Sequence, residues 1–258
     1  MNQLLLAVTV LAPTMLFAQS PFDGTWKENP EQAKLSPKPI IFSLNNGIYD
    51  SQSTVPKFHV KADGQDQSVS DQAYDSIAVK ELDTHTIQVV TKKNGKTDRE
   101  QTRTVSDDGK TLTVKMTLHP PDSNQTITRE FSLERVGNSP SGAHATSGSW
   151  RLQKYTLSEN GLLETYRSNG DELTCSTPTG FAWAAKPDGK DYPVKGTLNY
   201  DSVSLKQIDD HTIELGFKRG GKLIGISKNT VSSDGRKMTE VNENKLTGSV
   251  STSVSEKQ

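Results

Sequence analysis

The feature that most constrains this chain is an internal repeat. The segment YDSIAVKELDTHTIQVV begins at Tyr74, and the similar segment YDSVSLKQIDDHTIELG begins at Tyr200, 126 residues later. The same offset carries Gly95 onto Gly221. A register kept over this length without a gap indicates a duplication, so we expect two copies of one small fold.

The repeat predicts the domain organisation. We expect a signal peptide over residues 1–18, a first β-barrel over 19–136, a linker over 137–146 and a second β-barrel over 147–258. The linker lies in the stretch GNSPSGAHATSG, which is rich in Gly, Ser, Ala and Pro. That composition is typical of a flexible connection between domains.

The first 18 residues, MNQLLLAVTVLAPTMLFA, have no charged side chain and are mostly apolar. They are short for a membrane span and end in the small residue Ala18, as a cleaved secretory signal peptide does. The positive charge usual near the start of such a peptide is missing, and a short membrane anchor is the alternative. We therefore expect a secreted or periplasmic protein with no membrane span after cleavage.

Strand patterns dominate both copies. Apolar and polar residues alternate in TLTVKMTL (residues 111–118) and in HTIELGF (residues 211–217), a period of two that places one face of each strand in a core. Dipeptides such as Asn46-Gly47, Asn94-Gly95 and Asn160-Gly161 are typical of tight hairpins between strands. The sequence thus predicts an all-β fold of two tandem antiparallel meander barrels, about eight to ten strands each, with a β-sandwich as the alternative.

Charge and cysteine content exclude some functions. The chain has 30 Lys and Arg residues against 31 Asp and Glu residues and no basic run, so a phosphate backbone would find little to bind and we expect no nucleic-acid partner. Cys175 is the only cysteine, which excludes an intramolecular disulfide. We expect its thiol to be a buried, small apolar group.

The motif FDGTWK around Trp26 is repeated as SGSWRLQ around Trp150. It resembles the first strand of the calycin superfamily, the lipocalins and fatty-acid-binding proteins. The resemblance implies a lipocalin-like barrel in which each tryptophan plugs a closed end and a basic residue on the last strand lies across it. In the first copy the last strand is expected to be ITREFSLERV, so Arg135 is expected to cover Trp26.

A longer resemblance covers more of the chain. GTWKENPEQAKLSP, KPDGKDYPVKG, DSVSLKQIDDHTIE and VSSDGRKMT look like a family of uncharacterised secreted bacterial repeat domains. The first copy departs from that pattern at DGQDQSVSDQA, and the second departs from it after GSWRLQK. The resemblance implies a secreted protein and carries no activity over to this chain.

Candidate ligand-binding residues are Arg129, Phe131 and Trp183. A guanidinium on the otherwise apolar face of ITREFSLERV is costly unless it is paired or hydrogen-bonded. Fatty-acid-binding proteins hold a ligand carboxylate with Arg-x-Tyr on the last strand, and Arg129-Glu130-Phe131 is similar but lacks the phenol. This resemblance implies that Arg129 binds an acidic headgroup, with a solvated Arg at the barrel rim as the alternative. Phe181 and Trp183 either line a pocket of the second copy or belong to its core.

No catalytic, metal or cofactor pattern emerges from the sequence. The five histidines show no metal-ligand spacing, and the acidic doublets fall in expected turns. We therefore expect no cofactor and no metal, and favour a protein that is not an enzyme. The leading hypothesis is a secreted lipocalin-like protein that binds a small, partly apolar or acidic ligand. The alternative is a structural or interaction module of the cell envelope, with filled barrels and an unknown protein partner.

Overall fold

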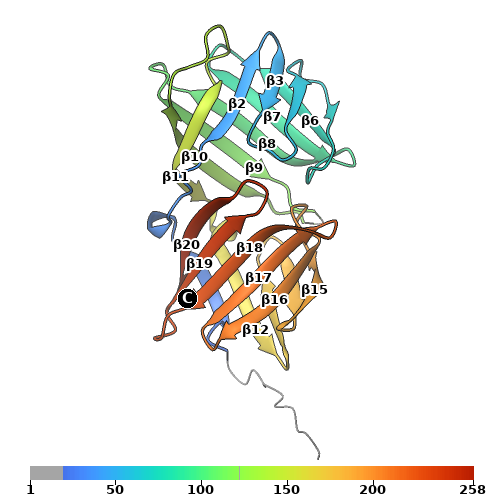
Figure 1. Cartoon of the computed structure of the whole chain (residues 1–258), viewed down its shortest axis with the longest axis vertical. Coiled ribbons are helices and arrows are strands. Elements are labelled where there is room, and N and C mark those ends of the chain that lie inside the picture. Colours follow the sequence, from blue (N-terminus) through green and yellow to red (C-terminus); the bar gives the residue numbers. More distant parts are fainter. Residues whose placement is uncertain (1–19, 122) are drawn as a thin grey trace, which may run out of the picture.

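The protein consists of two antiparallel β-barrels stacked end to end along the long axis of the molecule (Figure 1). The computed structural model describes residues 20–121 and 123–258, so the predicted signal peptide lies outside the described residues. Each barrel has ten strands, and one barrel is closed while the other is nearly closed. This confirms the predicted fold class of two tandem antiparallel barrels. Within the described residues, no helix has the length and apolar character needed to cross a membrane.

The first barrel is nearly closed, because its sheet runs β4-β3-β2-β11-β10-β9-β8-β7-β6-β5 without pairing between β4 and β5. Its strands are β2 (Ile40–Asn45), β3 (Ile48–Ser51), β4 (Phe58–Lys61), β5 (Gln67–Ser68), β6 (Ser76–Glu81), β7 (Thr86–Lys93), β8 (Lys96–Val105), β9 (Thr111–Leu118), β10 (Ile127–Val136) and β11 (Gly148–Leu157).

The second barrel is closed and combines the first strand of the described chain with the last nine. Its strands are β1 (Gly24–Glu28), β12 (Leu163–Asn169), β13 (Glu172–Ser176), β14 (Ala182–Ala185), β15 (Asp188–Lys195), β16 (Ser202–Asp209), β17 (Thr212–Arg219), β18 (Lys222–Val231), β19 (Lys237–Asn244) and β20 (Ser249–Lys257). A short 3-10 helix η1 (Pro30–Gln32) follows β1, and the one-turn helix α1 (Glu159–Leu162) links β11 to β12.

The two copies of the repeat have exchanged their first strands. Strand β1 of the first copy lies between β12 and β20 in the second barrel. Strand β11 of the second copy lies between β10 and β2 in the first barrel. The blue strand within the lower, mostly orange and red barrel shows this exchange (Figure 1). The predicted boundaries 19–136 and 147–258 are therefore wrong, since the first barrel is one continuous segment inserted between β1 and β12.

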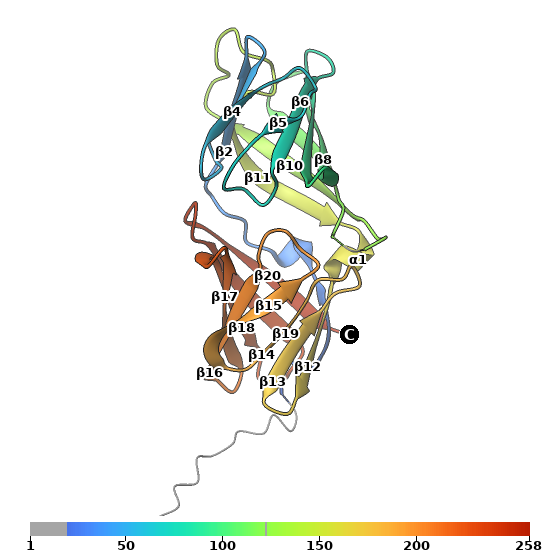
Figure 2. The ribbon, with the colours of Figure 1, turned by 90° about the vertical axis from the view of Figure 1, so that its right-hand side faces the viewer.

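The segment expected to be a linker between domains has a different role. Residues 137–146 connect β10 to β11, which are neighbouring strands of the same barrel. The loop is held in place, because the amide of His144 donates to the carbonyl of Leu44 and Arg135 donates to the carbonyl of Ala145. The chain passes between the barrels elsewhere, through residues 29–39 and through α1, which both lie at the junction (Figure 2).

Most predicted hairpins form at the expected dipeptides. Asn46-Gly47 and Asn94-Gly95 both adopt positive φ angles, and each connects two paired strands through a two-residue loop. Asn160-Gly161 differs from the prediction, because it lies in α1 at the crossing between the barrels. Here the Asn-Gly dipeptide lies between β11 and β12, which belong to different barrels, and not between two paired strands of a hairpin.

A tryptophan is the largest fully buried side chain of each barrel core. Trp26 packs with Tyr166 and Trp183 in the second barrel, and Trp150 packs with residues of the first barrel. The indole N–H of each tryptophan donates to the carbonyl of the residue four positions earlier, Phe22 or Thr146. Each barrel thus has its own plug, as predicted, but the plug comes from the other copy of the repeat.

The basic residue that covers each plug follows the strand exchange. The Arg135 guanidinium lies 4.1 Å from the centroid of the Trp150 ring, and the Lys257 ammonium lies 5.0 Å from that of Trp26. The expectation that Arg135 covers Trp26 is therefore wrong. The physical reason is that Arg135 pairs directly with Trp150 across β10 and β11, whereas Trp26 pairs with Lys257 across β1 and β20.

We expect Arg135→Ala to destabilise the first barrel much more than Lys257→Ala destabilises the second. Arg135 donates to three backbone carbonyls, those of Gly109, Ala145 and Ser147, whereas Lys257 donates to one. Loss of the cation–π contact and of three acceptor partners should cost about 2–4 kcal/mol for Arg135, against about 1 kcal/mol for Lys257. Urea unfolding of both variants measures the difference, and equal losses would contradict the role given to Arg135.

The open mouths of the two barrels face each other. In the first barrel the plug pair Arg135 and Trp150 lies at one end of β10 and β11, and the pair Arg129 and Leu157 lies at the other, next to α1. In the second barrel Trp26 lies away from the junction, and Glu28 lies toward it. The plugged ends are therefore the two poles of the molecule, and the mouths meet at its centre (Figure 1).

Candidate functional site

A cavity of about 320 Å³ lies where the two mouths meet. The first barrel contributes the junction ends of β8, β9 and β10, including Arg99, His119 and Arg129. The second barrel contributes Glu164 on β12 and the loops around Phe181 and Tyr200. Apolar surface in the cavity comes from Leu118 and Ile127 of the first barrel and from Leu198 of the second. The cavity can therefore receive a small molecule with both polar and apolar parts.

The cationic wall carries nitrogen atoms without hydrogen-bond partners. Arg99 Nε, His119 Nε2 and Arg129 Nε are buried and unpartnered, and they are the only such side-chain atoms among the described residues. Arg99 and His119 each have one carboxylate neighbour from the first barrel, with Arg99 Nη2 4.0 Å from Asp98 Oδ2 and His119 Nε2 3.4 Å from Glu100 Oε1. A buried donor without an acceptor is costly, and Arg99 and Arg129, which each have one, both line the cavity, so its cationic wall is a candidate site for an anionic group.

Arg129 is held in place by its strand. It alternates with the outward residues Thr128 and Glu130 on β10 and shares its inward face with Phe131 and Leu133. Burial lowers the pKa of the Arg129 guanidinium, and the positive charge of Arg99 lowers it further, while the carboxylate of Glu28 opposes that shift. The guanidinium remains charged, because the ordinary pKa of arginine is far above neutral.

Arg103 lies further inside the first barrel and is fully engaged. It donates from Nε and Nη2 to the side-chain oxygen of Gln101 and from Nη1 to the Tyr49 hydroxyl, and it stacks on the ring of Phe42 at 4.8 Å. The contrast separates the two kinds of arginine in this barrel. Arg103 is a structural element of the core, whereas Arg99 and Arg129 have unused donors at the mouth.

The second barrel presents carboxylates to the same junction. Three glutamates lie on the inward faces of their strands: Glu28 on β1, Glu164 on β12 and Glu240 on β19. Each is two residues away from a buried side chain of the same strand face, namely Trp26, Tyr166 and Met238. Glu28 accepts a short hydrogen bond from the Tyr155 hydroxyl of β11. Glu164 accepts from the Tyr166 hydroxyl at 3.2 Å. None of the three forms an ion pair with a described residue.

Burial and mutual repulsion shift the titration of these acids. Burial raises the pKa of Glu164, and the negative charge of Glu28 adds to the rise, while the hydrogen bond from Tyr166 opposes it. Burial raises the pKa of Glu240 well above its ordinary value, and the charges of Glu164 and Glu28 raise it further. Of Glu164 and Glu240, only Glu164 receives a hydrogen bond that favours its ionised form, so Glu240 retains its proton more strongly than Glu164.

The two copies of the repeat provide an internal comparison of the mouths. The strand registers place the carboxylates Glu28, Glu164 and Glu240 at positions where the first barrel has Leu152, Ile40 and Val114. They also place the cations Arg99, Arg103 and Arg129 at positions where the second barrel has Gly225, Asn229 and Ser251. The same fold forms with either set, so these charges are features of the mouths and not requirements of the barrel.

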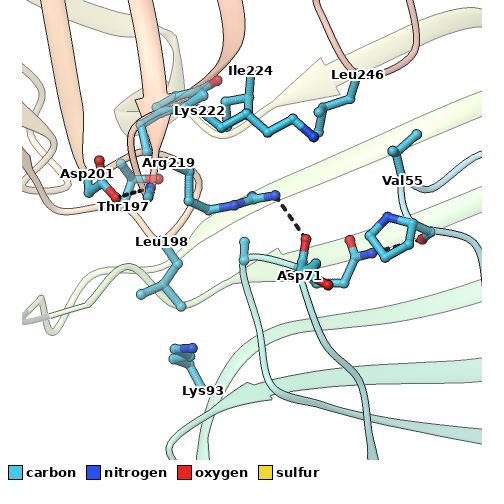
Figure 3. Close-up of a pocket in the computed structure, with 15 residues that line it drawn as sticks. Val55, Asp71, Lys93, Thr197, Leu198, Asp201, Arg219, Lys222, Ile224 and Leu246 are labelled. Atoms are coloured by element: carbon cyan, nitrogen blue, oxygen red, sulfur yellow. Dashed lines mark hydrogen bonds between the residues drawn. The ribbon is translucent and has the colours of Figure 1, made fainter.

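A second hollow, a groove of about 770 Å³, lies beside the cavity on the surface of the junction. Thr197, Leu198 and Tyr200 line both the groove and the cavity, so this loop between β15 and β16 separates them. Figure 3 shows Arg219 reaching across the groove, where it donates to the carbonyl oxygen of Asp71 at 3.3 Å. The groove is therefore a surface hollow next to the cavity, and the hydrogen bond between Arg219 and Asp71 connects the two barrels across it.

The structure separates the candidate residues of the sequence analysis. Arg129 lines the cavity. Phe131 packs against the core of the first barrel, and Trp183 is buried in the core of the second, edge-on to Tyr166 at 6.0 Å. Phe181, two residues before Trp183, lines the cavity instead. Trp183 thus belongs to the packing of the barrel and not to the cavity wall.

The remaining chemistry of the junction is limited. Cys175 is buried in the second barrel, and burial raises the pKa of its thiol well above its ordinary value, so it is a poor nucleophile. Within residues 20–121 and 123–258, no three His, Cys, Asp or Glu side chains are arranged to hold a metal ion. The arrangement can bind and orient a charged molecule, and it has no nucleophile paired with a base.

Sequence reasoning missed Arg99, His119 and the three inward carboxylates. The sequence does contain a sign that Glu240 faces inward. Glu240 lies two residues after the apolar Met238, so both side chains point to the same face of a strand, and the repeat aligns Glu240 with the apolar Val114. The strand exchange that brings Glu28 to the second barrel leaves no such mark in the sequence.

No protein-family model, curated protein or solved structure matches this chain.

Proposed function

We propose that this protein binds a small, partly apolar acidic ligand in the cavity between the two barrel mouths, without catalysing a reaction on it. The observation that carries the proposal is that the guanidinium groups of Arg99 and Arg129 both line one cavity, and each has a buried Nε donor without an acceptor. An anionic group would accept from the two guanidinium groups, which form strong charge-assisted hydrogen bonds. The apolar part of the ligand would contact Phe181, Ile127 and Leu198.

The second candidate is a structural or interaction module of the cell envelope that takes no ligand. The filled plugged halves of the barrels favour it, because Trp26 and Trp150 are both fully buried and leave no room at the poles. The two candidates differ in whether the central cavity is occupied in solution. Secretion or export to the periplasm is part of both.

We expect the wild-type protein to bind simple monocarboxylates such as butanoate, hexanoate and octanoate, with affinity that rises with chain length until the cavity is full. Arg129→Met removes the charge and the donors while it keeps the length of the side chain. This substitution should weaken binding about tenfold or more, because a hydrogen bond to a charged group contributes about 1.5–3 kcal/mol. Isothermal titration calorimetry measures the affinities.

Arg151→Met is the matched control. Arg151 lies on the neighbouring strand β11 and faces outward, where it pairs with Glu134 at 3.2 Å. Binding should be unchanged in this variant. If Arg129→Met binds the carboxylates as the wild type does, the cavity is not the site. If the wild type binds none of them and native mass spectrometry finds no small molecule bound to the purified protein, the module without a ligand is the better hypothesis.

A further inference from the structure

The central cavity is lined by charged side chains of both signs. Two guanidinium groups with free donors lie on the wall from the first barrel, and the Glu164 carboxylate lies on the wall from the second. Glu28 and Glu240 lie close enough to Glu164 to influence its charge. Isolated charges removed from water are costly unless each one has a partner. A ligand with only one charge would leave the other wall without a partner.

The opposite charges do not neutralise each other across the junction. No described ion pair joins Arg99 or Arg129 to Glu28, Glu164 or Glu240, and the only ionic neighbour of Arg99 is Asp98 on its own barrel. The Glu28 carboxylate, which influences Arg129, is engaged by the Tyr155 hydroxyl. The mouths therefore face each other with complementary charge and with a cavity between them that separates the two sets.

The fold does not require this cost. The equivalents of Glu28, Glu164 and Glu240 in the first barrel are the aliphatic residues Leu152, Ile40 and Val114. Aliphatic side chains at these positions would remove the burial cost of the carboxylates and close the same kind of barrel. The acidic residues at the mouth of the second barrel are thus not needed to form the barrel.

We infer that the ligand is a small zwitterion, whose anionic group binds Arg99 and Arg129 and whose protonated amine binds Glu164. Glu28 increases the negative potential around the amine, and the His119 ring lies on the anionic side. The apolar wall formed by Phe181, Ile127 and Leu198 contacts the carbon skeleton that joins the two charged ends. The inference rests on the proposed function, because it adds a second charge to the acidic ligand proposed above.

The test compares butanoate, hexanoate and octanoate with their ω-amino derivatives, using the intact protein. Each pair differs only by the terminal amine, and the series varies the distance between the charges. We expect one chain length at which the amino derivative binds at least about tenfold more tightly than its parent acid. The ω-hydroxy derivative of that length controls for the added size and polarity and should not gain affinity.

Glu164→Gln tests the assigned partner of the amine. The substitution keeps the shape of the side chain and an oxygen that accepts from Tyr166, and it removes the charge. It should abolish the preference for the amino derivative and leave the affinity for the parent acid within about twofold. The control is Glu214→Gln, because Glu214 lies on the outward face of β17 between the buried residues Ile213 and Leu215.

The outcomes separate the two proposals. If the parent acids bind and no amino derivative binds more tightly, the zwitterion is wrong and the acidic ligand stands. If an amino derivative is preferred equally by the wild type and by Glu164→Gln, the assignment of the amine to Glu164 is wrong. If neither series binds to the wild type, the cavity is not a ligand site. The wild-type comparison alone decides the main point, so it does not depend on the folding of any variant.

Discussion

Residues 37–158, expressed alone, are expected to fold into a stable monomeric barrel, whereas residues 19–136 are not. The first fragment contains all ten strands from β2 to β11 in one continuous segment, with the plug Trp150 and its cover Arg135. The second fragment follows the copy of the repeat seen in the sequence, and it lacks β11. Without that strand, β2 and β10 become unpaired edges and the core loses its largest side chain.

The loss in the shorter fragment should exceed the whole stability of the barrel. Removal of a buried tryptophan side chain costs about 3–5 kcal/mol, and a domain of this size is stable by only about 5–15 kcal/mol. The missing strand also removes its ladder of hydrogen bonds on both sides. Circular dichroism and urea unfolding of the two purified fragments measure the difference.

The complementary fragment provides a control. Residues 147–258 lack β1, which lies between β12 and β20, so we expect this half also to be unfolded alone. A mixture of residues 19–136 and 147–258 should regain structure, because the two halves together contain every strand. A cooperatively folded 19–136 fragment would contradict the prediction and would show that β1 can return to the barrel of its own copy.

The second large effect expected is a loss of stability that depends on Glu240 and develops as the pH rises above the ordinary glutamate pKa. Burial and the charges of Glu164 and Glu28 raise the pKa of Glu240 in the folded protein. The folded state therefore holds this proton at pH values at which the unfolded chain has released it. Its contribution to stability is complete below the ordinary glutamate pKa and is lost as the pH rises through the raised value.

Glu240→Gln should remove this dependence. We expect the variant to be more stable than the wild type by about 1–3 kcal/mol at pH values above the raised pKa, because it no longer buries a charge. The two proteins should differ little below the ordinary glutamate pKa, where Glu240 is protonated in both the folded and unfolded states. Urea unfolding at a series of pH values between about 5 and 9 provides the measurement.

Glu214→Gln, on the outer face of β17, is the matched control and should follow the wild type at every pH. Turn acids with a lowered pKa act at lower pH and do not obscure the effect. On protonation Asp83 loses the hydrogen bond from the His85 amide, and Asp108 loses the hydrogen bond from the Ser106 hydroxyl. A wild type whose stability stays constant through the whole range would contradict the assignment of a buried neutral acid in the second barrel.

The fold class could be predicted because strand alternation and turn dipeptides are local signals. Asn46-Gly47 and Asn94-Gly95 form hairpins because positive φ angles at these two positions depend on the residues themselves. The exchange of β1 and β11 could not be predicted. Both strands contain the same Gly-x-Trp motif, so either one satisfies the local pattern of either barrel. The choice depends on the path of residues 29–39 and α1 between the barrels.

The site was predictable only in part, for a related reason. Arg129 is visible in the sequence as a charge on an apolar strand face, and the structure places it at the cavity. Its partners there come from the other barrel, and Glu164 and Tyr200 lie far along the chain. A pocket formed where two domains meet has no signature within either domain. The misassignment of Trp183 has a similar origin, because alternation shows that a side chain points inward but not how deep it lies.

The insertion of one barrel within the other also sets an order of assembly for a chain that emerges amino terminus first. The first barrel has all its strands once Leu157 has emerged, so it can close before the rest of the chain follows. The second barrel needs β1, the earliest strand of the described chain, together with β20, the latest. Strand β1 must therefore stay unpaired and accessible until the last strand has emerged, and any factor that sequesters β1 would leave the carboxy-terminal barrel open.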